Sequence, residues 1–412
     1  MWSLQGFAVD DSEIVEEVRG QSGKKHRVKL IRVFDQRKHQ VCPCGSRTHE
    51  VLFEESQETW FRDCGLGEIE TYIVVRPKRL RCGSSSRVEV FPWAAPGGHR
   101  MTRRFFEMVA ALCVKLPVAE VARMALLSWN TVARVDAEAI RLALGGDTPT
   151  FGKLKWLGVD EVSRTGGNVF FTIVSDLESG RVVYLGEGKT EGALAAFFDQ
   201  LGPRGCKRIQ GVVSDLAASY LNVIVKYVPH AKHAIDRFHI VQWVNRALSD
   251  VRRRLFGGAP KNGLGRELKL KKWVLVSGRE NLKPESEQIL KRLEEVNQPL
   301  YQAYLLKEQL RALLHQSWTD FGMLRHSLRA WCVSAREAAP EFGRVAARLT
   351  QHEEKVVDGF LPGMKMGIVE AINGKVALLR WRARGYRIID YFKLKIFQAC
   401  SLGHNPWASV IL

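Results

Sequence analysis

The sequence predicts a multidomain protein: a small β-rich module, a short helical segment, and an α/β core that a long helical insertion interrupts. Three observations predict this organisation. Residues 1–98 alternate apolar and polar side chains at strand spacing, as in "HRVKLIRVFD" and "ETYIVVRPKRLRC". Residues 102–144 follow a helical pattern. From Trp156 onward strand and helix patterns mix, and residues 239–360 give helical patterns alone.

We therefore expect five segments, with a breaker cluster, "PWAAPGG", before the second of them. The predicted boundaries are 1–98 for the β module, 99–150 for the helical segment, 151–238 for the first part of the core, 239–362 for the helical insertion, and 363–412 for the last core helix and the tail.

The charge balance indicates an acidic partner. The 412 residues include 62 Lys and Arg against 44 Asp and Glu, a formal net charge of +18. Such a surplus is typical of proteins that bind nucleic acid or an anionic membrane. Nucleic acid is favoured, because the chain has no run of about 18 apolar residues. The early acidic residues predict no signal peptide, and the eight scattered cysteines do not form a secreted disulfide framework, so we expect a cytoplasmic, nucleoid-associated protein.

The β module carries cysteines in two short turns, "VCPCGSRTHE" and "RLRCGSSSRVE", which look like the two knuckles of a zinc ribbon. Cys42, Cys44 and Cys82 are the candidate zinc ligands, and either Cys64 or His49 would complete a set of four. A ribbon usually has Cys-x-x-Cys twice, whereas the first turn here is Cys-x-Cys and the second has one cysteine. The alternative is a small β module whose cysteines are remnants of a metal site or are simply buried.

The helical segment predicts a helix-turn-helix. A short helix over 118–124 is followed by a turn, and Ser128 stands where the N-cap of a second helix belongs. The first residues of that second helix would face bases or phosphates, and Arg residues ahead of the unit would hold the DNA backbone. The candidate DNA-binding residues are Trp129, Asn130, Thr131 and Arg134 on the helix, and Arg100, Arg103 and Arg104 before it. The alternative is a plain three-helix linker between two domains.

Two acidic residues end apolar strands of the predicted core: Asp160 in "WLGVDEVS" and Asp215 in "GVVSDLAASY". The predicted order is three meander strands, helix, strand, helix, strand. This order matches a ribonuclease H-like fold, where the first and fourth strands are neighbours, so the two carboxylates would lie close together. Close carboxylates repel each other, and hard oxygen ligands favour Mg²⁺ or Mn²⁺. Each acid alone is equally well explained as a helix cap.

A third carboxylate, Glu370, heads the basic helix "GIVEAINGKVALLRWRARGYR". It shares one helical face with Asn373 and Trp381, so it can point at the metal site. The basic residues expected to hold phosphates are Lys375, Arg380, Arg382, Arg384 and Arg387. Two metal ions about 3.5–4 Å apart could then support phosphoryl transfer. The plainer alternative is a first-turn acid that favours the helix dipole. Glu161 should point to the opposite sheet face, and Asp176 should lie in a turn.

Residues from about 99 to 397 resemble a DDE insertion-sequence transposase of the ISL-three group. The resemblance rests on "GVDEVS", "VVSDLAASYLNVI", "AIDRFHIVQWVNRAL" and the Glu370 helix. It implies that Asp160, Asp215 and Glu370 are the catalytic acids and bind Mg²⁺ or Mn²⁺. It also implies an N-terminal zinc ribbon, from which this sequence departs as described. The block "DRFH" matches at Asp236 to His239, with a structural or indirect role for Asp236.

The gap from Asp215 to Glu370 is 370 − 215 = 155 positions, longer than a bare core needs, which agrees with the helical insertion. The insertion begins with a basic run that includes Arg252, Arg253 and Arg254. Next to a phosphoryl-transfer site these residues are expected to contact DNA, although such a run is otherwise an ordinary solvated helix face.

The resemblance predicts a transposase that binds the terminal inverted repeats of an insertion sequence and catalyses DNA cleavage and strand transfer. Its partners would be the double-stranded DNA of the element ends and the target, with a homodimer on paired ends and no membrane partner. Two rival functions remain. A ribonuclease H-like nuclease would need neither the ribbon nor the helix-turn-helix. A catalytically silent DNA-binding regulator could have lost any of the three acids, which are all present.

Overall fold

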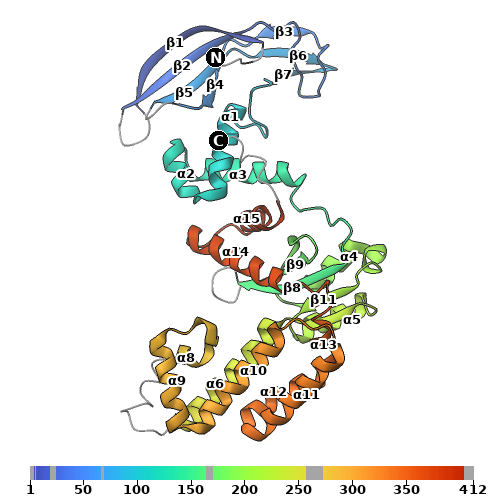
Figure 1. Ribbon diagram of the computed structural model, residues 1–412. Helices are drawn as coiled ribbons and strands as arrows, with labels where there is room; N and C mark the ends of the chain where they lie inside the picture. The colour runs from blue at the N-terminus through green and yellow to red at the C-terminus, as the bar shows by residue number, and fades with distance from the viewer. Residues whose placement is uncertain are drawn as a thin grey trace. The chain divides into compact units, whose positions relative to one another are not determined.

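The computed structural model describes residues 4, 6–18, 25–65, 69–163, 170–256 and 272–402. The chain divides into two compact units (Figure 1). The first unit contains Met1–Pro149 and Leu378–Leu412, and the second contains Thr150–Ala377. In the part of the chain that is described, no helix is both long enough and apolar enough to span a bilayer.

The β module of the first unit holds two sheets. One has the strand order β1-β2-β5-β4 and the other β3-β6-β7. Their bounds are β1 Phe7–Val18, β2 Lys25–Asp35, β3 Val51–Glu54, β4 Thr59–Asp63, β5 Glu70–Val75, β6 Lys78–Cys82 and β7 Ser85–Val88. Aromatic side chains form the core of the larger sheet, with the Phe61 ring edge-on to Phe91 and Trp93 at 5.5 and 5.0 Å between centroids.

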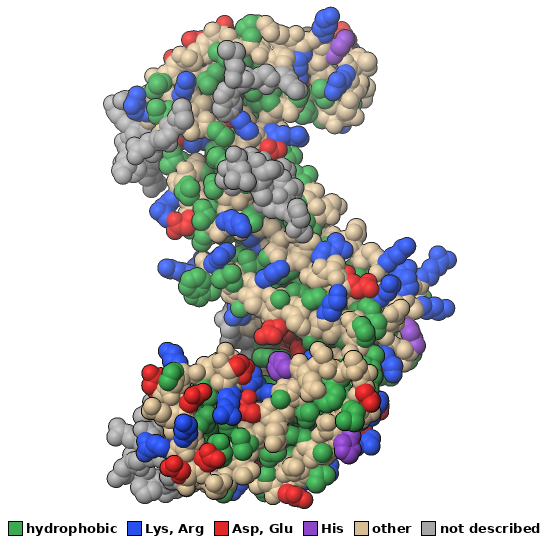
Figure 2. Space-filling view, viewed as in Figure 1, with side chains coloured by type: hydrophobic (Ala, Val, Ile, Leu, Met, Phe, Trp, Pro, Cys, Tyr) green, Lys and Arg blue, Asp and Glu red, His purple; other side chains and the backbone are tan. Residues whose placement is uncertain are grey.

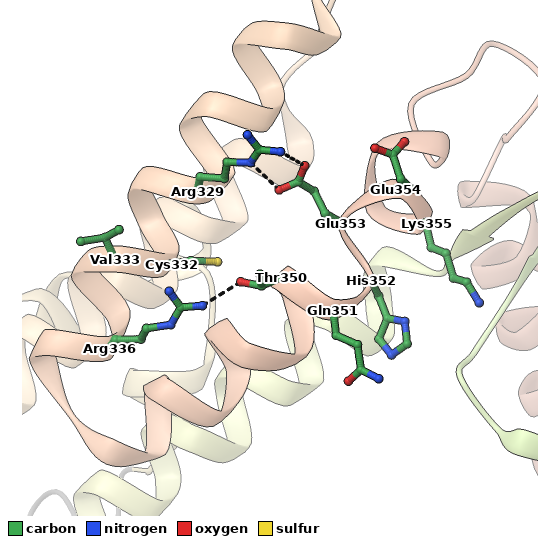
Figure 3. Close-up of a pocket in the computed structure, with 10 residues that line it drawn as sticks. All are labelled: Arg329, Cys332, Val333, Arg336, Thr350, Gln351, His352, Glu353, Glu354 and Lys355. Carbon is green, nitrogen blue, oxygen red and sulfur yellow. Dashed lines mark hydrogen bonds and ion pairs between the residues drawn. The ribbon is translucent and has the colours of Figure 1, made fainter.

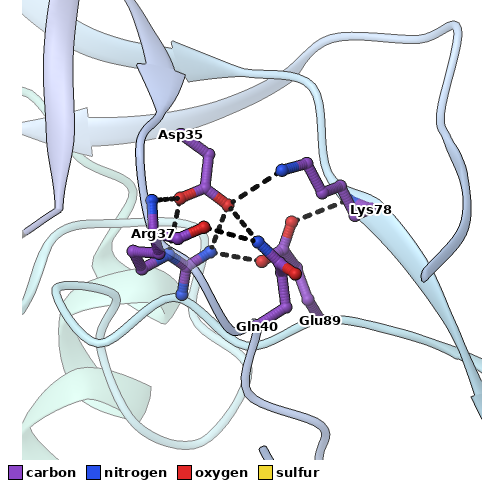
Figure 4. Close-up of polar contacts among 5 residues, drawn as sticks. All are labelled: Asp35, Arg37, Gln40, Lys78 and Glu89. Carbon is purple, nitrogen blue, oxygen red and sulfur yellow. Dashed lines mark hydrogen bonds and ion pairs between the residues drawn. The ribbon is translucent and has the colours of Figure 1, made fainter. Parts of the chain in front are cut away.

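A buried polar cluster joins the two sheets (Figure 4). Asp35 ends β2 and accepts hydrogen bonds from Arg37, while Arg37 also pairs with Glu89, whose side chain is fully buried. Glu89 in turn accepts the backbone N–H of Lys78 at the start of β6 (2.7 Å). Burial raises the pKa of Glu89, against the hydrogen bond from Lys78 and the charge of Arg37. The cluster therefore fixes the smaller sheet relative to the larger one within this module.

The helical segment contains three helices, as the sequence predicts: α1 Arg103–Lys115, α2 Val118–Ala125 and α3 Trp129–Leu144. Leu126 ends α2 in the left-handed conformation (φ 53°), and the chain turns at once into α3. Ser128 is the N-cap of α3, because its hydroxyl accepts the backbone N–H of Thr131 (3.1 Å). Buried apolar side chains from all three helices, including Phe106, Val121 and Val132, form their common core.

A fourth helix, α15 Ile389–Ser401, packs on α3 in the same unit. Ala137 and Ile140 of α3 are buried against Tyr391 and Leu394 of α15. Beside this apolar contact, Lys395 Nζ pairs with Asp136 Oδ2 (2.9 Å), and neither side chain is more than 6% exposed. Tyr391 donates to the same carboxylate oxygen (2.5 Å). The first unit thus joins two stretches of chain that are far apart in sequence.

The second unit is built on a five-stranded sheet of order β10-β9-β8-β11-β12. The elements follow the predicted order, with bounds β8 Trp156–Ser163, β9 Phe170–Asp176, β10 Arg181–Glu187, α4 Glu191–Cys206, β11 Gly211–Ser214, α5 Ala218–Tyr227 and β12 Lys232–Ile235. β8 and β11, the first and fourth strands, are neighbours, as predicted, and they pair in parallel. β8, β9 and β10 pair antiparallel, so the sheet is mixed.

The two faces of this sheet carry different helices. Leu157, Val159 and Val212 point into a core closed by α4 and α5. On the other face, Val213 and Ala234 pack with Val369 of α14, Gly367–Ala383. Gly158 lies on this second face, where a Cβ would come within 2.7 Å of Val369 Cγ2. Glycine at this position therefore lets the beginning of α14 lie directly on β8.

Between β12 and α14 the described residues form helices only, in agreement with the predicted strand-free zone. The helices are α6 Arg237–Phe256, α8 Lys272–Val276, α9 Pro284–Val296, α10 Gln298–His315, α11 Phe321–Ala338, α12 Pro340–Gln351 and α13 Glu353–Asp358, with a 3₁₀ turn at Arg279–Asn281. Side chains such as Leu248, Leu310 and Phe342 share one buried core. These helices therefore form a compact layer of their own.

A cavity of about 600 Å³ lies among α11, α12 and α13 (Figure 3). Both arginines that line it already have partners within the protein. Arg329 forms two hydrogen bonds with Glu353 (2.7 and 2.8 Å), and Arg336 donates to the Thr350 hydroxyl (2.9 Å). We assign this cavity no role.

Candidate catalytic site and metal centre

Three aspartates each come two residues after one of three residues that pair side by side across the sheet. Val213 of β11 pairs with Gly158 of β8 on one side and with Ala234 of β12 on the other. These three residues face α14. Because side chains alternate along a strand, the next positions on the same face lie two residues further on. Those positions are Asp160, Asp215 and Asp236.

Asp160 receives contacts from two helices. Its Oδ2 accepts a hydrogen bond from Asn373 Nδ2 of α14 (2.5 Å), and its Oδ1 accepts the backbone N–H of Glu161 (2.7 Å). His239 Nε2, in the first turn of α6, lies 4.0 Å from Oδ1. Side chains from α14 and α6 therefore converge on the middle of β8. The expectation that Asp160 ends its strand was wrong, because β8 continues to Ser163 and stays paired with β9.

Glu370 lies in the first turn of α14, three residues before Asn373, and its side chain is exposed. The chain leading into α14 is anchored by Arg237, the first residue of α6. The Arg237 guanidinium donates to the carbonyls of Leu314 (2.8 Å) and Gly359 (2.9 Å) and lies 4.0 Å from the Phe360 ring centroid. These contacts tie the beginning of α6 to α10 and to the chain just before α14.

Asp236 is almost fully buried, at 7% exposure. Burial raises its pKa, against a hydrogen bond from the Phe238 backbone and the charge of His239. The carboxylates of Asp160 and Glu370 raise the pKa further. Asp236 therefore lies within reach of the charges of Asp160 and Glu370. Among the described residues, these acids and Asp215 do not bring three ligand atoms within 4.8 Å of one another. Carboxylates are the donors that a hard divalent cation prefers.

Asp215 accepts the backbone N–H of Ala217 (2.9 Å), a contact that caps the turn into α5. Its charge also raises the pKa of Glu161, after the larger effects of burial and of Lys189. Glu161 pairs with Thr172 across the sheet, and the Tyr220 hydroxyl of α5 lies 3.1 Å from Thr172 Oγ1. Glu161 therefore faces α5, whereas Asp160 faces α14, as strand alternation predicts. Asp176 lies in the β9–β10 turn, where it accepts the N–H of Glu178 (3.0 Å).

The β module contains a four-residue Cys and His cluster. Ligand atoms of Cys42, Cys44, His49 and Cys82 all lie within 4.8 Å of one another. Cys44 Sγ is 3.1 Å from His49 Nε2. Within the described residues this is the one group of three or more such side chains that meets that distance. Three thiolates and an imidazole are a donor set typical of tetrahedral structural zinc, so the residues present fit that ion.

The local backbone explains why these ligands meet. Cys42 N–H donates to the Ser46 carbonyl and Gly45 N–H to the Cys42 carbonyl (2.9 and 2.8 Å), and Gly45 supplies the positive φ of 90° that this tight turn requires. Hydrogen bonds with the Ser46 backbone, and then with Cys42 and His49, lower the pKa of Cys44 to about 6. Of the two residues that could complete the set, the structure brings in His49. Cys64 instead packs against the helical core of α1–α3.

Comparison with known proteins agrees with this arrangement. The family model described as "Transposase" for the ISL3 DDE group matches residues 157–396, more than half of the chain. A second model, described as "Helix-turn-helix domain of transposase family ISL3", matches residues 89–140. The chain belongs to the ISL3 transposase family.

Curated relatives match along most of the chain. The transposase for insertion sequence element IS1001 of Bordetella parapertussis is 28% identical over 361 residues, which covers 86% of each chain. The transposase for insertion sequence element IS1557 of Mycobacterium tuberculosis is 28% identical over 374 residues, covering 84% of this chain and 82% of the relative. The helix-turn-helix and DDE domains imply that this transposase binds DNA and uses a divalent metal.

The predicted recognition residues of the transposase lie at the beginning of α3. Trp129, Asn130 and Arg134 are exposed there, and the Trp129 indole is edge-on to Tyr391 (6.4 Å). The Thr131 hydroxyl lies 2.8 Å from Ser128 Oγ, so Thr131 belongs to the cap of the helix. Three of the four side chains are therefore accessible to a ligand.

The predicted DNA-binding basic residues differ in whether they are exposed or already paired with acidic residues of the protein. Arg100 and Arg103 are exposed, whereas Arg104 pairs with the buried carboxylate of Asp63. In α6, Arg253 pairs with Asp250, and Arg254 forms two hydrogen bonds with Glu341 of α12. In and just after α14, Lys375, Arg382 and Arg384 are exposed. Arg387 is exposed and Arg380 half-buried, and each of these two interacts with another residue. Figure 2 shows Lys and Arg side chains spread over both units on the face drawn.

From the sequence, only a structural or indirect role was predicted for Asp236. The sequence also did not decide whether His49 or Cys64 is the fourth zinc ligand. A signal for Asp236 existed, because this acid directly follows the strand pattern "AKHAI" as Asp215 directly follows "GVVS". His49 carried no comparable signal, since its spacing from Cys44 matches no usual ribbon pattern.

Proposed function

We propose that this ISL3-family protein binds the terminal inverted repeats of its insertion sequence and catalyses DNA cleavage and strand transfer, with Asp160, Asp215 and Glu370 as the catalytic acids. The observation that carries the proposal is the hydrogen bond between Asn373 and Asp160. It supports an arrangement in which the helix that bears Glu370 meets β8 at Asp160, beside the end of β11.

The donor set at this sheet edge suits Mg²⁺ or Mn²⁺, which Asp160, Asp215 and Glu370 would hold. When bound, the two cations supply charge stabilisation for an in-line displacement at phosphorus. The chain's own residues position the proposed metal ligands. Asn373 would fix the Asp160 carboxylate, and Arg237 would fix the chain that leads into α14. Water would attack first and free a 3′-hydroxyl, which then attacks target DNA. No covalent bond to the protein is required.

DNA would be held by several surfaces. Trp129, Asn130 and Arg134 at the beginning of α3 suit base or phosphate contacts. Lys375, Arg382, Arg384 and Arg387 lie on or just after the helix that bears Glu370 and suit the phosphate backbone. Arg100 and Arg103 are further candidates, and the engaged Arg104, Arg253 and Arg254 are weaker ones. Trp381, 78% exposed beside Arg382, offers an aromatic face to a base.

Zinc would be bound by Cys42, Cys44, His49 and Cys82, and would hold the two turns of the smaller sheet together. We further propose that the five-stranded sheet is a ribonuclease H-like core, that the helices between β12 and α14 are an insertion in it, and that a homodimer acts on paired ends. The strand order and the parallel β8–β11 pair support the first of these proposals.

A plasmid assay tests the proposed reaction. The DNA that borders the gene on both sides is cloned into a supercoiled plasmid and incubated with the full chain and Mn²⁺. We expect cleavage at two borders and joining of the freed 3′ ends to target DNA. Asp160→Asn, Asp215→Asn and Glu370→Gln should each abolish both steps and leave DNA binding in a gel shift intact. Near-normal cleavage by two of the three variants would overturn the assignment.

The same assay separates the rival functions. A catalytically silent regulator predicts border-specific gel shifts without cleavage by the unaltered protein. A ribonuclease H-like nuclease predicts cleavage without joining and without preference for the borders. Asp176→Asn, a change at a buried turn aspartate of the same sheet, is the matched control and should keep full activity.

A further inference from the structure

Asp236 is a buried carboxylate with few partners. It is 7% exposed, and among the described residues one hydrogen bond reaches its side chain, from the backbone N–H of Phe238 to Oδ1 (3.0 Å). A buried acid usually needs several donors or a cation. Its neighbours do not neutralise it, because Asp160 and Glu370 are acidic and His239 is the one basic side chain among the main influences on its pKa.

Asp176 provides an internal comparison. It is equally buried, at 7% exposure, and also stands at the end of a strand of the same sheet. Yet it accepts hydrogen bonds from Glu178 N–H (3.0 Å), Ser179 N–H (3.3 Å) and the Ser179 hydroxyl (2.5 Å). The hydrogen bonds within this turn are enough to explain why an aspartate stands at position 176. The single N–H of Phe238 does not explain why a carboxylate, rather than a serine hydroxyl, stands at position 236.

The sheet register places Asp236 with the proposed catalytic acids. Ser214 pairs with Ile235, and Asp236 N–H continues the ladder by donating to the Ser214 carbonyl (3.0 Å). Asp236 is thus held by the backbone beside the end of β11, on the face where α14 begins. A carboxylate fixed in this way loses little conformational freedom when it binds a cation.

We propose that Asp236 is a further ligand of the divalent cation that Asp160 and Glu370 hold, so that the metal site draws on three adjacent strands and one helix. The inference rests on the proposed function, because it presumes a cation at these acids. It adds a ligand from the end of β12 to the set of Asp160, Asp215 and Glu370. The cation would give the buried carboxylate of Asp236 a positively charged partner.

The test measures metal binding without DNA. Mn²⁺ is titrated into the full, zinc-loaded chain, and bound Mn²⁺ is followed by the loss of the free-ion electron paramagnetic resonance signal. Asp236→Asn and Asp236→Ser should each weaken Mn²⁺ binding about tenfold or more, as changes at metal sites usually do. Asp236→Ser keeps an oxygen that can accept the Phe238 N–H, so it covers the case in which the Asn variant misfolds. Asp176→Asn should bind Mn²⁺ as the unaltered protein does.

Thermal melting separates a ligand from a structural residue. Without metal, Asp236→Asn should melt no lower than the unaltered chain, because it removes a charge from a crowded site, and Mn²⁺ should raise its melting temperature less. A lower metal-free melting temperature with unchanged Mn²⁺ affinity would overturn the proposal. Asp160→Asn reports on the premise: if it and the unaltered protein bind no Mn²⁺, the metal site itself is wrong. If Asp160→Asn loses binding and Asp236→Asn keeps it, only the role of Asp236 falls.

Discussion

Asn373 donates a hydrogen bond to Asp160 across 213 positions of sequence, from the second turn of α14 to the middle of β8. The bond orients a carboxylate whose other oxygen accepts the N–H of Glu161. It also joins α14 to β8 at a position three residues after Glu370. Asn373 is therefore a positioning residue for two of the proposed catalytic acids.

Asn373→Ala should slow cleavage of border DNA about tenfold, a usual effect of removing the partner of a metal ligand. We also expect a higher Mn²⁺ concentration for half-maximal rate, which a loss of folding alone would not cause. Single-turnover cleavage across a Mn²⁺ series measures both effects. Unchanged metal dependence with a lower melting temperature would show that Asn373 only packs the helix. Lys375→Ala, an exposed change on the same helix, is the control for metal dependence.

Zinc removal should destabilise the β module. Cys82→Ser is expected to abolish bound zinc, because three ligands from one turn do not close a tetrahedral site. The measurement is zinc per chain by plasma mass spectrometry, together with thermal melting before and after chelation. Cys64→Ser is the matched control and should keep one zinc, since Cys64 lies against the helical core. Equal zinc contents in the two variants would contradict the proposed ligand set.

The free energy of unfolding should fall as the pH drops below about 6.5. Burial, and then the charges of Lys355 and His352, lower the pKa of His233 to about 4. The unfolded chain therefore takes up this proton at a higher pH than the folded chain does. Between the two pKa values the folded state loses about 3 kcal/mol in all. Below about 4 the loss is complete.

His233→Asn should flatten this part of the stability curve, because the titrating group is gone. Denaturant unfolding at pH values from 4 to 7 measures the slope. His230→Asn, at an exposed position before β12, should leave the slope as it is. A His233→Asn curve parallel to that of the unaltered protein would mean that other groups cause the acid sensitivity.

Sequence discrimination should depend on the beginning of α3. Asn130→Ala and Arg134→Ala together should reduce the preference for border DNA over scrambled DNA, by about 1–3 kcal/mol for each bidentate base pairing that is removed. Competition gel shifts measure the ratio, and melting checks the fold. Arg123→Ala is the control, because Arg123 is exposed on α2 but pairs with Glu120. A folded double variant that keeps the original ratio would exclude this helix as the reader of sequence.

Salt dependence should distinguish the two basic regions. Arg382→Gln with Arg384→Gln should lower the slope of log affinity against log salt by about 0.9 for each phosphate that is no longer neutralised. Arg253→Gln with Arg254→Gln should change the slope less, because carboxylates already hold both guanidinium groups. That second pair should instead lower the melting temperature, since Arg254 joins α6 to α12. A larger slope change from the α6 pair would reverse this ranking.

The sequence predicted features that depend on local pattern. Ser128 as a cap, the turn at Leu126 and the succession of strands and helices along the chain around Asp160 follow from side-chain period and turn chemistry, and the structure confirms them. These signals lie within short windows, which is why one sequence suffices to find them.

The features that the sequence did not predict depend on partners distant along the chain. Arg104 was expected to face phosphate, but Asp63 holds it from a strand of the β module. Likewise, the sequence around Lys395 does not indicate that this residue pairs with Asp136. The sequence around Asp236 does not indicate which strands lie beside it. Such pairings are fixed by tertiary packing, which periodicity does not encode.

The contact between α3 and α15 has a consequence for biosynthesis. A ribosome makes α3 early and α15 late, so on the nascent chain Ala137, Ile140 and the carboxylate of Asp136 lack the surface that later buries them. Until α15 emerges, the helix-turn-helix carries an uncovered apolar face and an uncompensated charge. The core of the helix-turn-helix is thereby completed only after the proposed catalytic residues have been made. A product truncated before α15 would keep the whole helix-turn-helix sequence but would lack the helix that covers one face of α3.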